Sequence, residues 1–149
     1  MNHSFVNWAE IDLDAIAFNV QAIRRQVGPG VEIMPAVKAN AYGHGAAPVS
    51  KAALQAGATR LAVHRVIEAV ELRQAGIDAP VLVMGYCPPT DAPYIATWNV
   101  TPSLMTIETA WALSAAGGAA GRTIPVHIKV DTGMSRYGLL PEEVLEFVR

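Results

Sequence analysis

Apolar and polar positions along the chain alternate between a helical and a strand period, and this pattern predicts helices between strands. Residues 8–13 alternate like a half-exposed strand, and Asp14 is expected to cap a helix that Gly28-Pro29-Gly30 ends. The apolar run 31–37 predicts a buried strand. Later strands are predicted at 61–63, 81–84, 100–104 and 124–130, and later helices at 48–56, 65–74, 91–97, 106–116 and 142–149.

Strands that are apolar on both faces and alternate with helices predict an α/β protein with a parallel sheet and right-handed crossovers. A doubly wound open sheet and a barrel fit this pattern equally well. In the helix predicted over 65–74, Glu68, Glu71 and Arg73 are expected to face solvent. The Ala/Gly-rich stretch 115–121 lacks the spacing of a phosphate-binding loop and is interpreted as a helix cap and loop.

Composition and charge exclude several classes of protein. The 149-residue chain is 52% hydrophobic and 16% charged, which predicts a single folded domain over 1–149. A net charge of −2 offers no basic surface for nucleic acid. The single cysteine, Cys87, excludes an internal disulfide and fits a reducing compartment. The first eight residues lack a signal-peptide pattern, and the longest uncharged run, 92–107, is too short to cross a bilayer, so we expect a cytoplasmic protein without a membrane partner.

The strongest candidate for chemistry is Lys38, which closes the apolar run 31–37 instead of lying on a charged face. Parallel strands of α/β proteins carry their functional residues at this C-terminal end. Lys38 therefore has either a carboxylate partner or a lowered pKa, as an amine that forms a Schiff base requires. The alternative is a structural lysine. The histidines show no ligand spacing with cysteine or carboxylates, so no metal site is expected: His3, His44, His64 and His127.

Two stretches of sequence resemble a known family. Residues 36–45 read Ala-Val-Lys-Ala-Asn-Ala-Tyr-Gly-His-Gly and resemble the cofactor-attachment motif of alanine racemases, which use pyridoxal 5′-phosphate (PLP) to interconvert L- and D-alanine. Residues 127–138 read His-Ile-Lys-Val-Asp-Thr-Gly-Met-Ser-Arg-Tyr-Gly and resemble that family's second N-terminal signature. The resemblance extends from Trp8 to the last residue without a large insertion.

The resemblance implies a (β/α)8 TIM-type barrel, of which this chain holds about five parallel strands with their helices. The strand at 8–13 would belong to the family's other domain. A complete barrel needs about 250 residues. The remaining barrel and the C-terminal sheet domain are therefore expected to be absent from the chain, and five strands with open edges are expected to be marginally stable.

The resemblance also implies roles for the first motif. Lys38 would form the Schiff base with PLP and act as the base on the face that handles the D-alanine proton. Tyr42 would hydrogen-bond the cofactor phosphate, the alternative being a core-edge tyrosine. Gly43 and Gly45 would allow a tight turn. His44 would orient the loop through a hydrogen bond rather than act as a base.

The second motif supplies further candidates. Arg136 matches the arginine that contacts the cofactor ring oxygen and the substrate carboxylate, and the alternative is a surface arginine. Lys129 matches a lysine that carbon dioxide carbamylates in some members, where the new anion holds the arginine. The alternative is an unmodified lysine paired with Asp131. Ser135 and Tyr137 stand where many relatives carry glycine and leucine.

The implied activity is racemisation of alanine by two bases, which supplies D-alanine for peptidoglycan. The second base is a tyrosine from a partner subunit in a homodimer, and no residue of this chain corresponds to it. Two alternatives are a non-catalytic PLP-binding barrel, whose lysine loop lacks Asn-Ala-Tyr-Gly-His-Gly, and an inactive truncated fragment. Related decarboxylases typically have a cysteine near the lysine, where this chain has Ala39-Asn40-Ala41.

Overall fold

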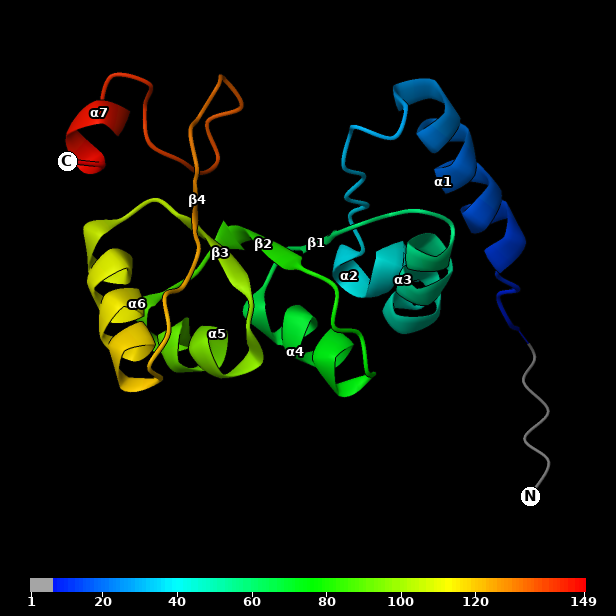
Figure 1. Cartoon of the computed structure of the whole chain (residues 1–149), viewed down its shortest axis with the longest axis horizontal. Coiled ribbons are helices and arrows are strands. Elements are labelled where there is room, and N and C mark those ends of the chain that lie inside the picture. Colours follow the sequence, from blue (N-terminus) through cyan, green and yellow to red (C-terminus); the bar gives the residue numbers. More distant parts are fainter. Residues whose placement is uncertain (1–6) are drawn as a thin grey trace.

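The computed structural model describes residues 7–149, which form one parallel sheet with helices packed against it (Figure 1). The strands follow one another in the order β1-β2-β3-β4, and every neighbouring pair is parallel. This arrangement confirms the predicted α/β class. The elements are α1 (Leu13–Val27), α2 (Lys38–Tyr42), α3 (Ala46–Gln55), β1 (Leu61–Val63), α4 (Val66–Gln74), β2 (Val81–Tyr86), η1 (Pro89–Asp91), α5 (Ala92–Trp98), β3 (Thr101–Leu104), α6 (Ile107–Ala119), β4 (His127–Ile128) and α7 (Val144–Phe147).

Helices α4, α5 and α6 line one side of the sheet in chain order, as the outer helices of a barrel do (Figure 1). The segment that joins β4 to α7 lies on the other side. A sheet covered on one side by consecutive crossover helices is the arrangement expected of part of a (β/α)8 barrel. The helices predicted from periodicity are all present, and their bounds differ from the prediction by a few residues.

The predicted strand at 8–13 is not formed. Residues 7–12 have no strand partner in the described chain, and α1 begins at Leu13. A strand exists only as a hydrogen-bonded pair, so an alternating pattern alone cannot produce one. The expected cap is also wrong by two residues, because Asp12 rather than Asp14 accepts the hydrogen bond from the Ala15 amide, at 3.0 Å.

The segment 31–37 lies beside β1 as a fifth, irregular strand. The Val37 amide donates to the Ala62 carbonyl at 2.8 Å, and the Ala62 amide donates to the Pro35 carbonyl at 3.0 Å. Pro35 has no amide hydrogen, so the ladder does not extend into a regular strand. The strand predicted at 124–130 is likewise reduced to the two residues of β4.

Helix α6 continues through the stretch that the sequence assigned to a cap and loop, and it ends at Ala119. Gly117 lies within the helix because the chain turns back closely against it. A Cβ atom at this position would lie 2.7 Å from the Arg122 carbonyl oxygen. Gly117 therefore serves close packing rather than helix termination at Ala116.

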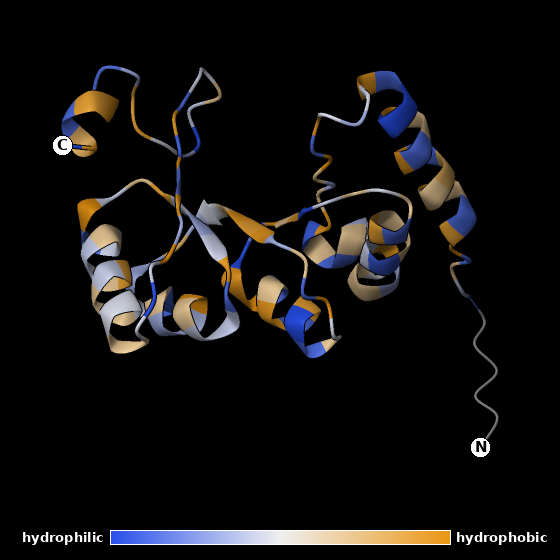
Figure 2. Cartoon of the chain, viewed as in Figure 1, coloured by the Kyte–Doolittle hydropathy of each residue, from blue (hydrophilic) through white to orange (hydrophobic). Residues whose placement is uncertain are grey.

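The core lies between the sheet and helices α4 to α6. Its most buried side chains come from β1 and β2, where Leu61, Val63 and Val83 are fully inaccessible, and Figure 2 shows the apolar character of β2. Cys87 is also fully buried in this core, and burial, with Asp91 nearby, raises the pKa of its thiol to about 12. Among the helices of residues 7–149, none combines the length and the apolar composition needed to cross a membrane.

Arg73 of α4 does not face solvent as predicted. Its guanidinium donates hydrogen bonds to four backbone carbonyls at 2.7–3.0 Å, those of Ile77, Ala79, Trp98 and Asn99. Burial lowers the pKa of this group, with the negative charge of Asp78 acting in the opposite direction. Arg73 therefore joins the turns that follow α4 and α5.

Candidate functional site

A cavity of about 190 Å³ lies at the C-terminal ends of the strands, and the two motifs meet there. Lys38 follows the segment 31–37, whereas Lys129 and Arg136 come from the segment after β4. All three line this cavity, as the resemblance requires of residues that share a ligand. Its wall also contains His64, Met84, Val130, Asp131, Thr132, Met134 and Tyr137.

The backbone after Lys38 forms a left-handed turn. Ala39, Asn40, Ala41 and Tyr42 have φ angles of 50°, 54°, 52° and 54°, so α2 is not a right-handed helix. A residue other than glycine in this region costs about 1–2 kcal/mol. A run of four such residues persists only where surrounding contacts determine the conformation, and such strain is concentrated at functional sites.

Hydrogen bonds at both ends of the turn supply those contacts. At its beginning the Ala39 amide donates to Glu68 Oε1 at 2.7 Å. At its end the Ala46 amide donates to Asn40 Oδ1 at 2.7 Å, and His44 Nδ1 lies 2.9 Å from the Ala41 carbonyl, the orienting role expected of His44. The predicted tight turn at the two glycines is confirmed, because Gly43 and Gly45 have φ angles of 87° and 90°.

Glu68 is half-buried on α4, so the prediction that it faces solvent is wrong. Besides the Ala39 amide, its carboxylate accepts from the amides of His64 and Arg65 at 2.7 and 2.9 Å. Burial raises the pKa of Glu68, but the three amides and the positive charge of Arg65 outweigh burial and hold the pKa below its usual range. Glu68 is therefore ionised at neutral pH.

Lys38 and Tyr42 lie next to each other, with Lys38 Nζ 5.9 Å from the centroid of the Tyr42 ring. Tyr42 is 62% exposed and does not line the cavity that contains Lys38. Within residues 7–149 the one ion pair joins Arg60 to Glu32, so the carboxylate partner considered for Lys38 is not found there.

The segment that carries Arg136 is held mainly by its own residues. Asp131 Oδ1 accepts from the amides of Gly133 and Ser135, each at 2.9 Å, and these bonds hold the pKa of Asp131 below its usual range. The Asp131 carboxylate therefore serves the turn and forms no ion pair with Lys129, contrary to the alternative considered for that lysine. Arg136 itself is exposed.

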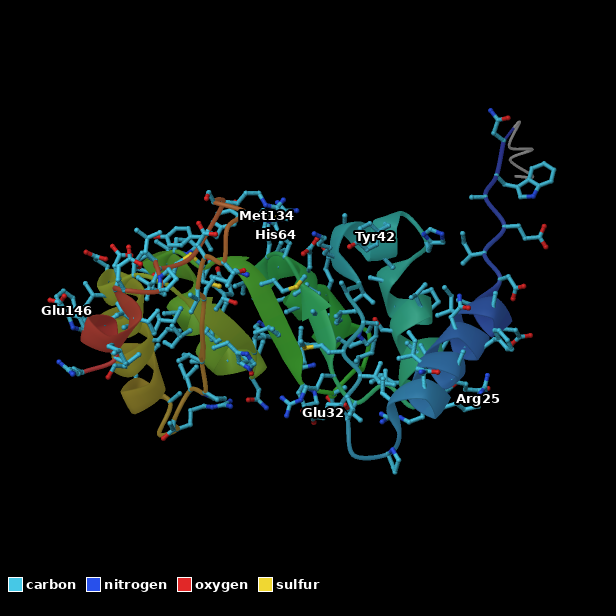
Figure 3. The ribbon with its side chains drawn as sticks, turned by 90° about the horizontal axis from the view of Figure 1, so that it is seen from above. Arg25, Glu32, Tyr42, His64, Met134 and Glu146 are labelled. Carbon is cyan, nitrogen blue, oxygen red and sulfur yellow. The ribbon has the colours of Figure 1, made fainter. Side chains whose placement is uncertain are left out.

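Two aromatic side chains to which the sequence analysis assigned no role lie between this segment and the end of β1. The rings of His64 and Tyr137 lie 6.1 Å apart, and Figure 3 shows the labelled His64 and Met134 close together, both in the wall of this cavity. His64 directly follows β1 and is therefore at a strand end, the same signal that identified Lys38. Close packing holds it there, because a Cβ atom on Gly85 would lie 2.5 Å from the His64 carbonyl oxygen.

The charge of the cavity fits a small anionic ligand. Lys38, Lys129 and Arg136 bring three cationic groups to it, and the carboxylate of Asp131 is engaged by backbone amides. Guanidinium and ammonium groups are the usual protein partners of carboxylates and phosphates. The fold and the site thus define an α/β barrel-type domain with a strand-end lysine in a cationic cavity.

The chain belongs to the family described as "Alanine racemase, N-terminal domain", whose model matches residues 11–149. This result favours the racemase over the non-catalytic PLP-binding barrel. The chain is 50% identical over 136 residues to the alanine racemase of Desulforamulus reducens and 48% identical over 136 residues to that of Methanococcus maripaludis. It covers 37% and 36% of their lengths, and 91% of this chain is aligned in each case.

Solved structures give the same result for the fold. The alanine racemase of Clostridium difficile 630 superposes with a TM-score of 0.92 at 36% identity, covering 99% of this chain and 39% of that one. The alanine racemase of Bacillus anthracis, solved with bound L-Ala-P, gives a TM-score of 0.86 at 43% identity over 93% of this chain and 36% of its own. The chain thus spans little more than a third of the relatives it matches.

Proposed function

We propose that this chain is the lysine-bearing, N-terminal part of a PLP-dependent alanine racemase that interconverts L- and D-alanine. The observation that carries the proposal is the convergence of Lys38, Lys129 and Arg136, from two separate motifs, on one cavity at the strand ends. The relatives named alanine racemase and the bound L-Ala-P of the Bacillus anthracis structure support the same assignment.

Lys38 would hold PLP covalently and, once the amine of alanine has displaced it, would take or return the α-proton on the D-alanine face. Lys38 is a half-buried residue of the cavity wall, and its amine has no carboxylate partner within residues 7–149. PLP, when bound, delocalises the electron pair left by removal of the α-proton. The task left to the protein is to orient the substrate and place a base, and Lys38 is the candidate base that lines the cavity.

Arg136 would bind the carboxylate of alanine and the ring oxygen of the cofactor through its guanidinium fork. Lys129 lies in the same cavity wall and would hold Arg136 in place if its amine carried a carbamate formed with carbon dioxide. Tyr42 would bind the phosphate. Its exposed ring beside Lys38, outside the cavity, is consistent with a phosphate that lies on that side of the lysine.

The remaining parts of the activity lie outside this chain. We infer that the rest of the barrel, a C-terminal sheet domain and the second base complete the enzyme, which acts as a cytoplasmic homodimer and supplies D-alanine for peptidoglycan. Residues 1–149 then form the N-terminal part of the PLP-binding barrel. The open strand edges at the segment 31–37 and at β4 are where such additional strands would pair.

The chain contains only three lysines, Lys38, Lys51 and Lys129, which makes covalent trapping a direct test. The purified chain is incubated with PLP, reduced with borohydride and analysed by intact mass and peptide mapping. We expect the main adduct at Lys38 on the wild type and on the matched control Lys51→Ala, and only a minor adduct, at the exposed Lys51, on Lys38→Ala. A wild-type chain without an adduct, or an equal yield on Lys38→Ala, would contradict the proposal.

A further inference from the structure

We propose that Glu68 positions Lys38, by tying the left-handed turn that follows the lysine to the end of β1. This inference rests on the role proposed for Lys38. Glu68 does not touch the amine and is a positioning residue. It belongs to α4, whereas the amide it binds belongs to a turn 29 residues earlier in the chain.

The two carboxylate oxygens of Glu68 serve two different elements. Oε2 accepts from the amides of His64 and Arg65, which caps the first turn of α4 in the manner of a capping box. Oε1 is not needed for that cap and accepts from the Ala39 amide at 2.7 Å. One side chain therefore joins the start of α4 to the residue directly after Lys38.

The contact acts on Lys38 through the peptide plane. The Ala39 amide belongs to the peptide group whose other side is the Lys38 carbonyl, so fixing this amide fixes the ψ angle of Lys38. The ψ angle of Lys38 determines how the lysine residue is oriented relative to the turn that follows it. It therefore also determines how Lys38 is oriented at the cavity. The other side-chain ties of the turn, from Asn40 and His44, lie at its far end.

The charge of Glu68 suits this role. A neutral amide or acid has one strong acceptor oxygen, whereas the ionised carboxylate accepts three amide hydrogens here. Glu68 forms no ion pair with Lys38 among the residues that the structure describes, so it orients the lysine without neutralising it. Glu71, three residues further along the same helix, is exposed and provides a matched control.

The test compares Glu68→Gln with Glu71→Gln in the purified chain. Glutamine keeps one acceptor oxygen, so it can cap α4 while it turns an N–H₂ group toward the Ala39 amide. We expect exchange of the Ala39 amide hydrogen to become about tenfold faster in Glu68→Gln, because a charge-assisted hydrogen bond is lost. We also expect the ratio of trapped PLP at Lys38 to that at the exposed Lys51 to fall, and neither change to occur in Glu71→Gln.

A second variant separates reach from charge. Glu68→Asp can still cap α4, but its side chain is one methylene shorter and should lose the hydrogen bond from the Ala39 amide. We expect the same faster exchange of the Ala39 amide and the same fall in the ratio of trapped PLP at Lys38 to that at Lys51. The proposal is overturned if Ala39 exchange is unchanged in both variants, or if it changes while the Lys38 to Lys51 ratio does not. If wild-type Lys38 traps no PLP, the proposed function fails instead, and the Ala39 exchange still decides whether Glu68 holds the turn.

Discussion

The two segments that meet at the cavity are held in different ways. The turn after Lys38 is tied to α4 by Glu68, a contact 29 residues away in sequence, and it packs Ala41 into the core. The segment around Arg136 is tied by Asp131, whose Oδ1 accepts from the amides two and four residues ahead. One segment is therefore anchored to the body of the domain, whereas the other is organised mainly by itself.

This difference matches the different roles proposed for Lys38 and Arg136. A base that takes a proton from a fixed direction benefits from a rigid support, and a clamp for a substrate carboxylate can close when the ligand arrives. The strained turn supplies the support, because distant contacts determine its conformation. The exposed Arg136 lies on the segment that is held mainly by local hydrogen bonds.

The largest effect is expected from Gly85→Ala. The added Cβ would lie 2.5 Å from the His64 carbonyl oxygen, where the C-terminal ends of β1 and β2 lie side by side, so these two strand ends must separate. We expect a loss of about 3 kcal/mol in the free energy of unfolding. Urea unfolding followed by circular dichroism measures it, and labelling of the buried Cys87 with a thiol reagent reports the same global opening. A stability equal to that of the wild type would contradict this packing.

Gly138→Ala is the counterpart in the second segment. Gly138 has a φ of 117°, and a Cβ there would lie 2.7 Å from the Asp131 amide nitrogen. The loop must therefore rearrange, but its few contacts with the core predict a change of less than about 1 kcal/mol in global stability. Loss of amide protection at Leu139 with unchanged Cys87 labelling is the expected result. Cys87 labelling as fast as in Gly85→Ala would show that the segment is part of the core.

Acid should weaken the contact that ties the first segment to α4. The folded-state pKa of Glu68 lies below its ordinary value of 4.5, so the unfolded chain binds its proton first as the pH falls. The stabilisation from Glu68 is present above about pH 4.5 and is lost as the pH falls through the folded-state pKa. The stability difference between wild type and Glu68→Gln should therefore shrink below pH 4.5. A difference that is constant with pH would contradict the ionised contact.

The smallest effects are expected from strain relief at left-handed residues. Ala39→Gly and Ser135→Gly each remove the cost of a φ near 50°, and the flexibility of glycine in the unfolded chain offsets part of this gain. We expect each variant to gain about 0.5 kcal/mol in unfolding free energy if the position reports on global stability. Because the first segment is anchored to the body of the domain and the second is organised mainly by itself, Ala39→Gly should show the gain and Ser135→Gly should not. Equal gains would weaken the contrast.

The sequence predicted the sheet and its helices well, because buried strands and helices differ in hydrophobic period. It failed at 8–13, since a strand needs a partner that periodicity does not reveal. The convergence of Lys38 with Arg136 followed from a family resemblance and not from spacing. Glu68 and Arg73 were assigned to solvent because a helical pattern shows the side of a residue but not how far its side chain reaches. The marginal stability of the chain stays a prediction.

Amide hydrogen exchange of the wild-type chain, resolved by segment, tests most directly the claim that this chain holds the Lys38 turn by itself. We expect slow exchange at three amides of the turn. The Ala39 amide donates to Glu68, the Ala41 amide to the Val37 carbonyl and the Gly43 amide to the Ala39 carbonyl. The amides of Arg136 and Tyr137, which have no acceptor in residues 7–149, should exchange at rates near those of an unfolded peptide. Equal, fast exchange in both segments would contradict it.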